Sequence, residues 1–161
     1  ATADTHLHLP TVTASRDELA ALDFAPFTAL NDLPMAMTAH IIFAAYDADR
    51  PATQSSEMIR VIRQEIGFQG LLMTDDLNMQ ALSGSLGQRT RAAMDAGCDI
   101  ALHCKGDMAE MLEVAAEAGD MRPDTQSRAA TALARRTPSD TVDIAALEAD
   151  LAAMGQGALD G

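Results

Sequence analysis

The chain has 161 residues, of which 48% are apolar and 22% charged, which fits one globular domain and excludes the low-hydrophobicity composition of disordered chains. Its formal net charge is −13 with only 11 lysines and arginines, and this balance would repel a phosphate backbone, so we expect no nucleic-acid partner. The sequence shows no apolar run near the ~20 residues that span a bilayer and no secretion signal at its N-terminus, so we expect a cytoplasmic protein without membrane contact.

The first predicted helix begins at a capping box, Ser15-Arg-Asp-Glu18, in which serine and glutamate satisfy each other's exposed backbone N–H groups. The apolar residues from Leu19 to Leu30 continue at helical spacing, and Pro26 predicts a break or kink among them. The apolar run 35–42 follows a proline and is short, which favours a strand over a helix.

From residue 55 onward the pattern alternates helices and strands. It predicts a helix capped by Ser55 or Ser56 and ended by Gly67, a strand at 70–74, a helix at 86–96 ended by Gly97, a strand at 98–104, a helix from 107 to about 118, and Ala-rich helices at 124–136 and 143–153. Alternating strands and helices with short connections are typical of parallel βα units, so the fold class is α/β. A (β/α)8 barrel has eight strands in roughly 250 residues, so this chain could supply about half of one.

Each predicted strand ends in polar residues that are capable of chemistry. His40 follows the first strand, Asp75 and Asp76 follow the second, and His103 with Lys105 ends the third. Because the carboxyl ends of parallel strands line the active sites of α/β folds, we expect these side chains to lie on one face.

The acids Asp75 and Asp76 are candidates for a nucleophile, because a carboxylate can form and then release an ester with an anomeric carbon. Such a reaction also needs a proton donor, and Asp4-Thr5-His6 provides an imidazole with a carboxylate nearby to orient it. A solvated turn and a solvated surface pair are the ordinary alternatives for these residues, and the neighbouring His8 competes with His6.

The remaining candidates are weaker. No two of His40, His103 and Cys104 have the spacing of a helical or Cys-x-x-Cys metal site, so we expect no bound metal. Cys98 and Cys104 lie at opposite ends of one predicted strand, roughly 20 Å apart at ~3.3 Å per residue. They are therefore too far apart for a disulfide, and we interpret both as small buried apolar residues.

Four segments together resemble the β-N-acetylhexosaminidases of glycoside hydrolase family 3. They are Met37-Thr-Ala-His40, Asp49-Arg-Pro-Ala-Thr53, Ile66-Gly-Phe-Gln-Gly-Leu-Leu-Met-Thr-Asp-Asp-Leu-Asn-Met79 and Ala96-Gly-Cys-Asp99. The resemblance runs in order from about residue 3 to 112, and its central motif is specific.

The resemblance implies a TIM-barrel catalytic domain and a retaining mechanism without a cofactor. Asp75 matches the family's nucleophile, His6 its histidine acid/base, and Asp4 the carboxylate partner of that histidine. His40, Asp76 and Met79 become candidate substrate-binding residues. The implied substrates are terminal β-linked N-acetylglucosamine residues, as in the muropeptides of cell-wall recycling.

The family's K-H-F-P-G-H-G segment, which normally precedes the acid/base motif, is absent from this sequence. We therefore expect residues 1–119 to form the C-terminal half of a TIM barrel and residues 120–161 a helical extension. With most of the substrate clamp missing, activity of the chain alone should be weak.

Two other hypotheses remain. One is a non-catalytic half-barrel that self-associates or pairs with another chain through open sheet edges. The other is an α/β binding module in which Asp75, Asp76 and Lys105 form an acidic pocket for Mg²⁺.

Overall fold

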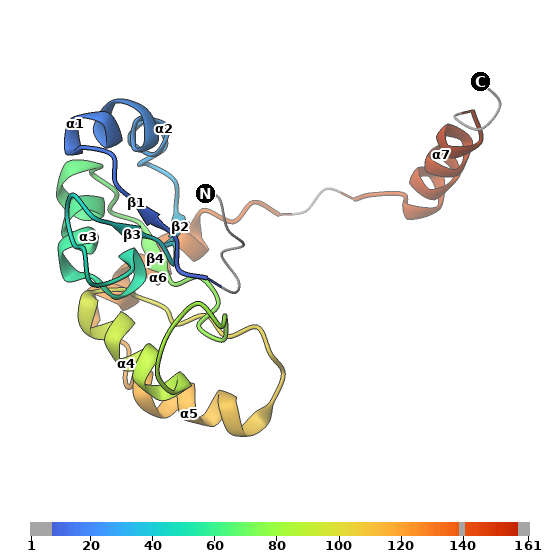
Figure 1. The fold of residues 1–161 in the computed structure, drawn as a ribbon. Helices are drawn as coiled ribbons and strands as arrows, with labels where there is room; N and C mark the ends of the chain where they lie inside the picture. Colours follow the sequence, from blue (N-terminus) through green and yellow to red (C-terminus); the bar gives the residue numbers. More distant parts are fainter. Residues whose placement is uncertain (1–7, 139–140, 158–161) are drawn as a thin grey trace.

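The computed structural model describes residues 8–138 and 141–157. Short strands lie at the centre, helices pack beside them, and α7 lies apart from the other elements (Figure 1). The elements are β1 (Thr11–Val12), α1 (Arg16–Glu18), η1 (Leu19–Asp23), α2 (Ala25–Ala29), β2 (Met35–Met37), β3 (Ile42–Phe43), η2 (Ala52–Gln54), α3 (Ser56–Arg60), η3 (Val61–Glu65), β4 (Leu71–Met73), α4 (Leu86–Ala96), α5 (Met108–Ala118), α6 (Pro123–Ala134) and α7 (Ile144–Gly157). The α/β class is confirmed, whereas a half TIM barrel stays a prediction.

The helix ends follow the capping residues in the sequence. Ser15 and Glu18 form the predicted capping box, and the helix is interrupted at Phe24 before α2 begins with Pro26 in its first turn. Ser55 caps the next helix by accepting a hydrogen bond from the backbone N–H of Met58. Local hydrogen bonding therefore sets these boundaries, which is why they could be predicted.

The glycine and aspartate signals are also confirmed. Gly67 and Gly97 have φ values of +84° and +115°, in the left-handed region that favours glycine at a helix end. Asp107 caps α5 through the backbone N–H of Glu110. Gly97 therefore ends α4 and Asp107 begins α5 at the predicted positions.

Two predicted strands have a different form in the structure. The run 35–42 is not one strand, because β2 pairs with β4 while β3 pairs with β1 in a second parallel sheet. The segment 98–104 forms only one bridge, between Ile100 and Met73. Beyond that bridge the backbone N–H of Leu102 donates to the Thr74 hydroxyl, 2.8 Å away, instead of to a main-chain carbonyl. The side chain therefore interrupts the ladder.

The β2–β4 sheet has one well-packed face. Ala36 and Leu72 are register partners, and both contact the core that forms around Ile59, Phe68 and Leu77. This face anchors β4, whose last residue leads directly into the Asp75-Asp76 turn.

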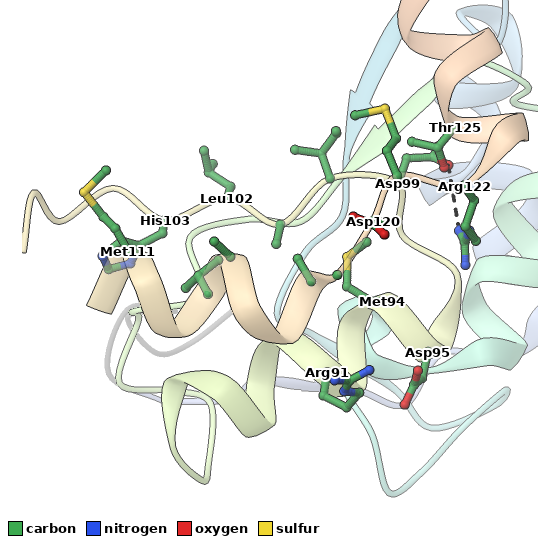
Figure 2. Close-up of a pocket in the computed structure, with 17 residues that line it drawn as sticks. Arg91, Met94, Asp95, Asp99, Leu102, His103, Met111, Asp120, Arg122 and Thr125 are labelled. Carbon is green, nitrogen blue, oxygen red and sulfur yellow. Dashed lines mark hydrogen bonds and ion pairs between the residues drawn. The ribbon is translucent and has the colours of Figure 1, made fainter. Parts of the chain in front are cut away.

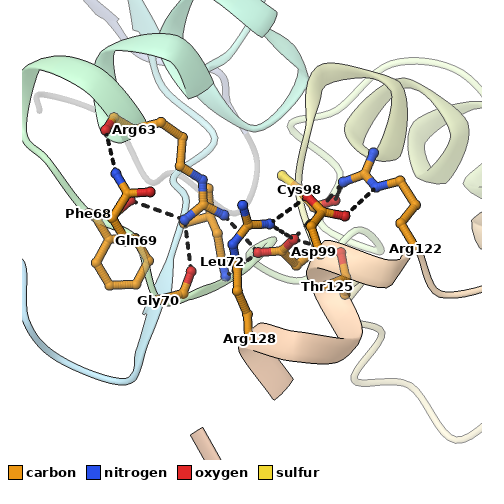
Figure 3. Close-up of polar contacts among 11 residues, drawn as sticks. Arg63, Phe68, Gln69, Gly70, Leu72, Cys98, Asp99, Arg122, Thr125 and Arg128 are labelled. Atoms are coloured by element: carbon orange, nitrogen blue, oxygen red, sulfur yellow. Dashed lines mark hydrogen bonds and ion pairs between the residues drawn. The ribbon is translucent and has the colours of Figure 1, made fainter. Parts of the chain in front are cut away.

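Helix α6 is tied to the sheet by one buried carboxylate, that of Asp99 (Figure 3). Its Oδ1 accepts hydrogen bonds from Thr125 and Arg128 of α6, each 2.8 Å away. Its Oδ2 lies 2.7 Å from the Arg63 guanidinium and 2.9 Å from the backbone nitrogen of Leu72 in β4. The predicted domain boundary between residues 119 and 120 stays a prediction.

Among the residues that the structure describes, no helix is long and apolar enough to cross a membrane.

Candidate active site

The two acids after β4 form a tightly held turn. Asp75 Oδ1 accepts a hydrogen bond from the backbone N–H of Asp76 at 2.8 Å. Asp76 Oδ1 accepts from the backbone nitrogens of Asn78 at 3.0 Å and Cys104 at 3.2 Å. Both acids are half-buried, and no hydrogen bond from a described residue reaches Asp75 Oδ2. One oxygen of Asp75 is therefore held by the backbone, and the other makes no hydrogen bond with any described residue.

His40 lies against this turn from the protein interior. Its Nε2 is 3.0 Å from the carbonyl oxygen of Asp76, and its Nδ1 is 2.9 Å from the hydroxyl of Thr53. The residue is only 2% exposed. The structure thus brings His40 and the acids together, as predicted, but by a contact to the backbone of the turn.

At the end of the third predicted strand, the backbone of Cys104 contacts Asp76, whereas the side chains of His103 and Lys105 contact another acid. Lys105 Nζ lies 2.7 Å from Glu110 Oε1, and His103 Nε2 lies 3.4 Å from Glu110 Oε2. Figure 2 shows His103 beside Met111, and both residues line a cavity of about 560 Å³. Asp75 and Asp76 do not line this cavity. Lys105 therefore does not complete an acidic pocket. Across residues 8–138 and 141–157, no three His, Cys, Asp or Glu residues gather in a way that could hold a metal.

Met79 follows the acids in the same loop. Met79 is buried, and its carbonyl oxygen accepts a hydrogen bond from the Arg89 guanidinium at 3.1 Å. The same guanidinium also donates to the carbonyl oxygen of Leu77. Arg89 of α4 thereby holds the loop that continues from the acids. A substrate contact by Met79 or Asp76 stays a prediction.

The predicted acid/base His6 and its partner Asp4 lie outside the described residues.

Sequence reasoning missed Thr53, which is fully buried and bonds to both Thr38 and His40. It lies in the Asp49–Thr53 segment of the resemblance, and this was the signal that could have identified it. Its hydroxyl joins η2 to the end of β2 beneath the acid turn.

The two cysteines differ, contrary to the expectation that both are buried. Cys98 is buried, and burial raises the pKa of its thiol to about 12. Cys104 is exposed, and its pKa is raised by partial desolvation and then by the charges of Asp76 and Asp75. Cys104 is therefore a chemical reporter of the acid turn.

Under native conditions at pH 8, iodoacetamide should modify Cys104 alone, because the thiolate is the nucleophile and Cys98 is buried. Replacing Asp76 by asparagine removes one of the charges that raise the pKa of Cys104, so modification should become several-fold faster. Peptide mass mapping over time gives both rates, and Asp120→Asn, an exposed acid elsewhere, is the control. Equal modification of Cys98 would contradict the structure.

Comparisons with known proteins place this chain in a family. Residues 1–135 match the family described as Glycosyl hydrolase family 3 N terminal domain. A Beta-hexosaminidase from Alkalilimnicola ehrlichii is 45% identical over 106 residues, which are 63% of this chain and 30% of the relative. A Beta-hexosaminidase from Neisseria gonorrhoeae is 38% identical over 105 residues, which are 63% of this chain and 29% of the relative. The chain therefore spans about a third of the length of these relatives.

Solved structures show the same fold. A glycoside hydrolase family 3 β-N-acetylglucosaminidase from Paenibacillus superposes with a TM-score of 0.70 and 26% identity, over 88% of this chain and 31% of the other. NagZ from Neisseria gonorrhoeae, in complex with N-trifluoroacetyl-D-glucosamine, gives a TM-score of 0.67 and 29% identity, over 96% of this chain and 43% of the other. Because the family match includes β2, β4 and the whole acid turn, the chain belongs to glycosyl hydrolase family 3.

Proposed function

We propose that this chain provides the nucleophile of a retaining β-N-acetylhexosaminidase that removes terminal β-linked N-acetylglucosamine. The main support is the geometry of Asp75, whose Oδ1 is held by the next backbone N–H while no described residue bonds to Oδ2. The curated relatives are named Beta-hexosaminidase, and one solved neighbour binds an N-acylated glucosamine analogue. A carboxylate held in this way suits attack on an anomeric carbon.

The proposed reaction has two steps. In the first, Asp75 Oδ2 attacks the anomeric carbon to form a glycosyl ester, while the imidazolium of His6 gives its proton to the departing oxygen. In the second, His6 takes a proton from water as that water attacks the same carbon and releases the Asp75 carboxylate. Asp4 would orient His6 and stabilise its charged form.

The remaining assignments rest on the same resemblance. Asp76 and Met79 are proposed to contact the sugar, and muropeptide-derived disaccharides are the proposed natural substrates. A cytoplasmic location fits that substrate and stays a prediction.

The direct test is the hydrolysis of 4-nitrophenyl N-acetyl-β-glucosaminide by the purified chain. Because the family's K-H-F-P-G-H-G segment is absent from this sequence, we expect turnover far below that of a full-length relative. The product first detected by proton NMR should be the β-anomer, since two inversions at one carbon retain configuration. An α-anomer as first product would contradict the role of Asp75.

A second candidate function is association through the open edge of β2. Within the described residues β2 pairs only with β4, and Met35 and Met37 on its free face are 44% and 50% exposed. An unpaired strand beside exposed apolar side chains favours pairing with another chain. Sedimentation velocity should then show dimers that Met37→Lys disrupts and that Met108→Lys, at a 67% exposed position on α5, does not. A monomer at all concentrations would count against this candidate.

A further inference from the structure

We propose that His40 is a positioning residue for the nucleophile, and that its Nε2–H holds the backbone of the acid turn in place. This inference rests on the proposed role of Asp75. It also replaces the expectation that His40 binds substrate, because a side chain on a residue that is 2% exposed has almost no surface to offer a sugar.

The contacts of Asp76 show how His40 can act on Asp75. The N–H of Asp76 donates to Asp75 Oδ1 at 2.8 Å, and the carbonyl of Asp76 accepts from His40 Nε2 at 3.0 Å. The two ends of residue 76 are thus bonded to the nucleophile and to the imidazole. Without His40 the carbonyl would keep only the local 3.2 Å hydrogen bond from the Met79 N–H. The turn could then rotate against the protein interior, and the N–H that orients the Asp75 carboxylate would rotate with it.

The atom that donates is determined by the partner. A carbonyl oxygen can only accept, so the Nε2 that faces Asp76 carries a hydrogen. The other nitrogen, Nδ1, is held by the Thr53 hydroxyl, which lies 2.8 Å from the Thr38 hydroxyl and 3.1 Å from the Ala39 carbonyl oxygen. The ring is therefore bonded on both sides by buried groups, and such a pair of contacts fixes its orientation.

The turn is also held from a second element, which makes the role of His40 specific. Asp76 Oδ1 accepts from the Cys104 and Asn78 backbones, so the side chain of Asp76 stays anchored when His40 is changed. The Asp76 carbonyl also accepts from the backbone N–H of Met79 at 3.2 Å, within the same loop. Among the described residues, what His40 alone supplies is a side-chain donor that ties this carbonyl to a segment outside the loop. Its loss should misorient the nucleophile without unfolding the loop.

Two variants of the full chain separate this role from others. In His40→Gln the amide nitrogen can take the place of Nε2, whereas in His40→Asn it reaches only the region of Nδ1. We expect His40→Asn to lower kcat by about 100-fold with KM within about threefold, as for a misplaced reacting group. His40→Gln should keep kcat within about fivefold. The assay uses 2,4-dinitrophenyl N-acetyl-β-glucosaminide, whose good leaving group reduces dependence on the acid/base.

A raised KM with unchanged kcat would overturn the proposal in favour of a substrate contact. Equal kcat losses in both variants, matched by equal falls in melting temperature, would reduce His40 to a structural residue and overturn it as well.

A measurement without substrate keeps this test separate from that of the proposed function. In carbon-13-labelled chain, loss of the hydrogen bond should move the carbonyl resonance of Asp76 upfield in His40→Asn, while His40→Gln should stay near wild type. If wild type shows no turnover, the proposed function fails in this chain and the carbonyl shifts still decide the role of His40. An Asp76 carbonyl resonance that is the same in all three proteins would overturn the inference.

Discussion

Replacing Asp75 by asparagine should lower the turnover of an aryl N-acetyl-β-glucosaminide by on the order of 10⁴-fold or more, with no change in fold. An amide cannot form the glycosyl ester, so the first chemical step has no nucleophile. The amide oxygen can still accept the 2.8 Å hydrogen bond from the Asp76 backbone. The turn should therefore persist, and circular dichroism should match wild type.

A rescue experiment identifies the missing group. In Asp75→Ala, added azide can enter the space of the carboxylate and attack the anomeric carbon from the same side, so an α-glycosyl azide should form. Asp120→Asn changes an exposed acid outside the turn and should leave turnover unchanged. Full activity in Asp75→Asn, or azide product from wild type alone, would remove Asp75 from the role of nucleophile.

The parts of the fold that could be predicted depend on local bonds. Ser15, Ser55 and Asp107 cap helices within three residues of themselves, and Gly97 supplies the left-handed φ that ends α4. Each of these signals is complete within one turn of chain. The sequence alone was therefore enough to place these helix boundaries.

The strand predictions depended on partners far away in the sequence and were less accurate. Whether residues 35–42 form one strand is decided by β1 and β4, which divide the run between two sheets. In the segment after Cys98, the backbone N–H of Leu102 bonds to the side-chain hydroxyl of Thr74, which is 28 residues away in the sequence, and the strand pairing ends there. A hydrophobic pattern reports which residues are buried, and it does not report which backbone groups they pair with.

The site shows the same division. Asp75 and Asp76 could be predicted because they follow a buried strand within a specific motif. The contact of His40 with the Asp76 carbonyl and the participation of Thr53 require β2, η2 and β4 to be placed together. The resemblance suggested a substrate ligand at position 40, whereas the structure shows its buried imidazole bonded to the Asp76 backbone.

Asp99 provides the second large expected effect, on stability. Its carboxylate, fully buried, bonds to Arg63, Arg128 and Thr125 at 2.7 to 2.8 Å (Figure 3). Burial lowers the pKa of Arg63, and the charge of Asp99 opposes that shift. Asp99→Ala leaves the guanidinium groups of Arg63 and Arg128, and that of Arg122 at 4.0 Å, without this partner. Removing one member of a buried charge cluster typically costs about 3–5 kcal/mol.

Asp124 offers a matched control on the same arginine, since its exposed carboxylate lies 3.0 Å from Arg128. Asp124→Ala should lower the free energy of unfolding only slightly, because solvent screens an exposed pair. Urea unfolding followed by circular dichroism measures both variants, as the chain has no tryptophan. Adding Arg63→Met to Asp99→Ala should recover part of the loss, because the second change removes one of the charges left unpaired. Equal losses for Asp99→Ala and Asp124→Ala would mean that burial of Asp99 contributes nothing to holding α6 on β4.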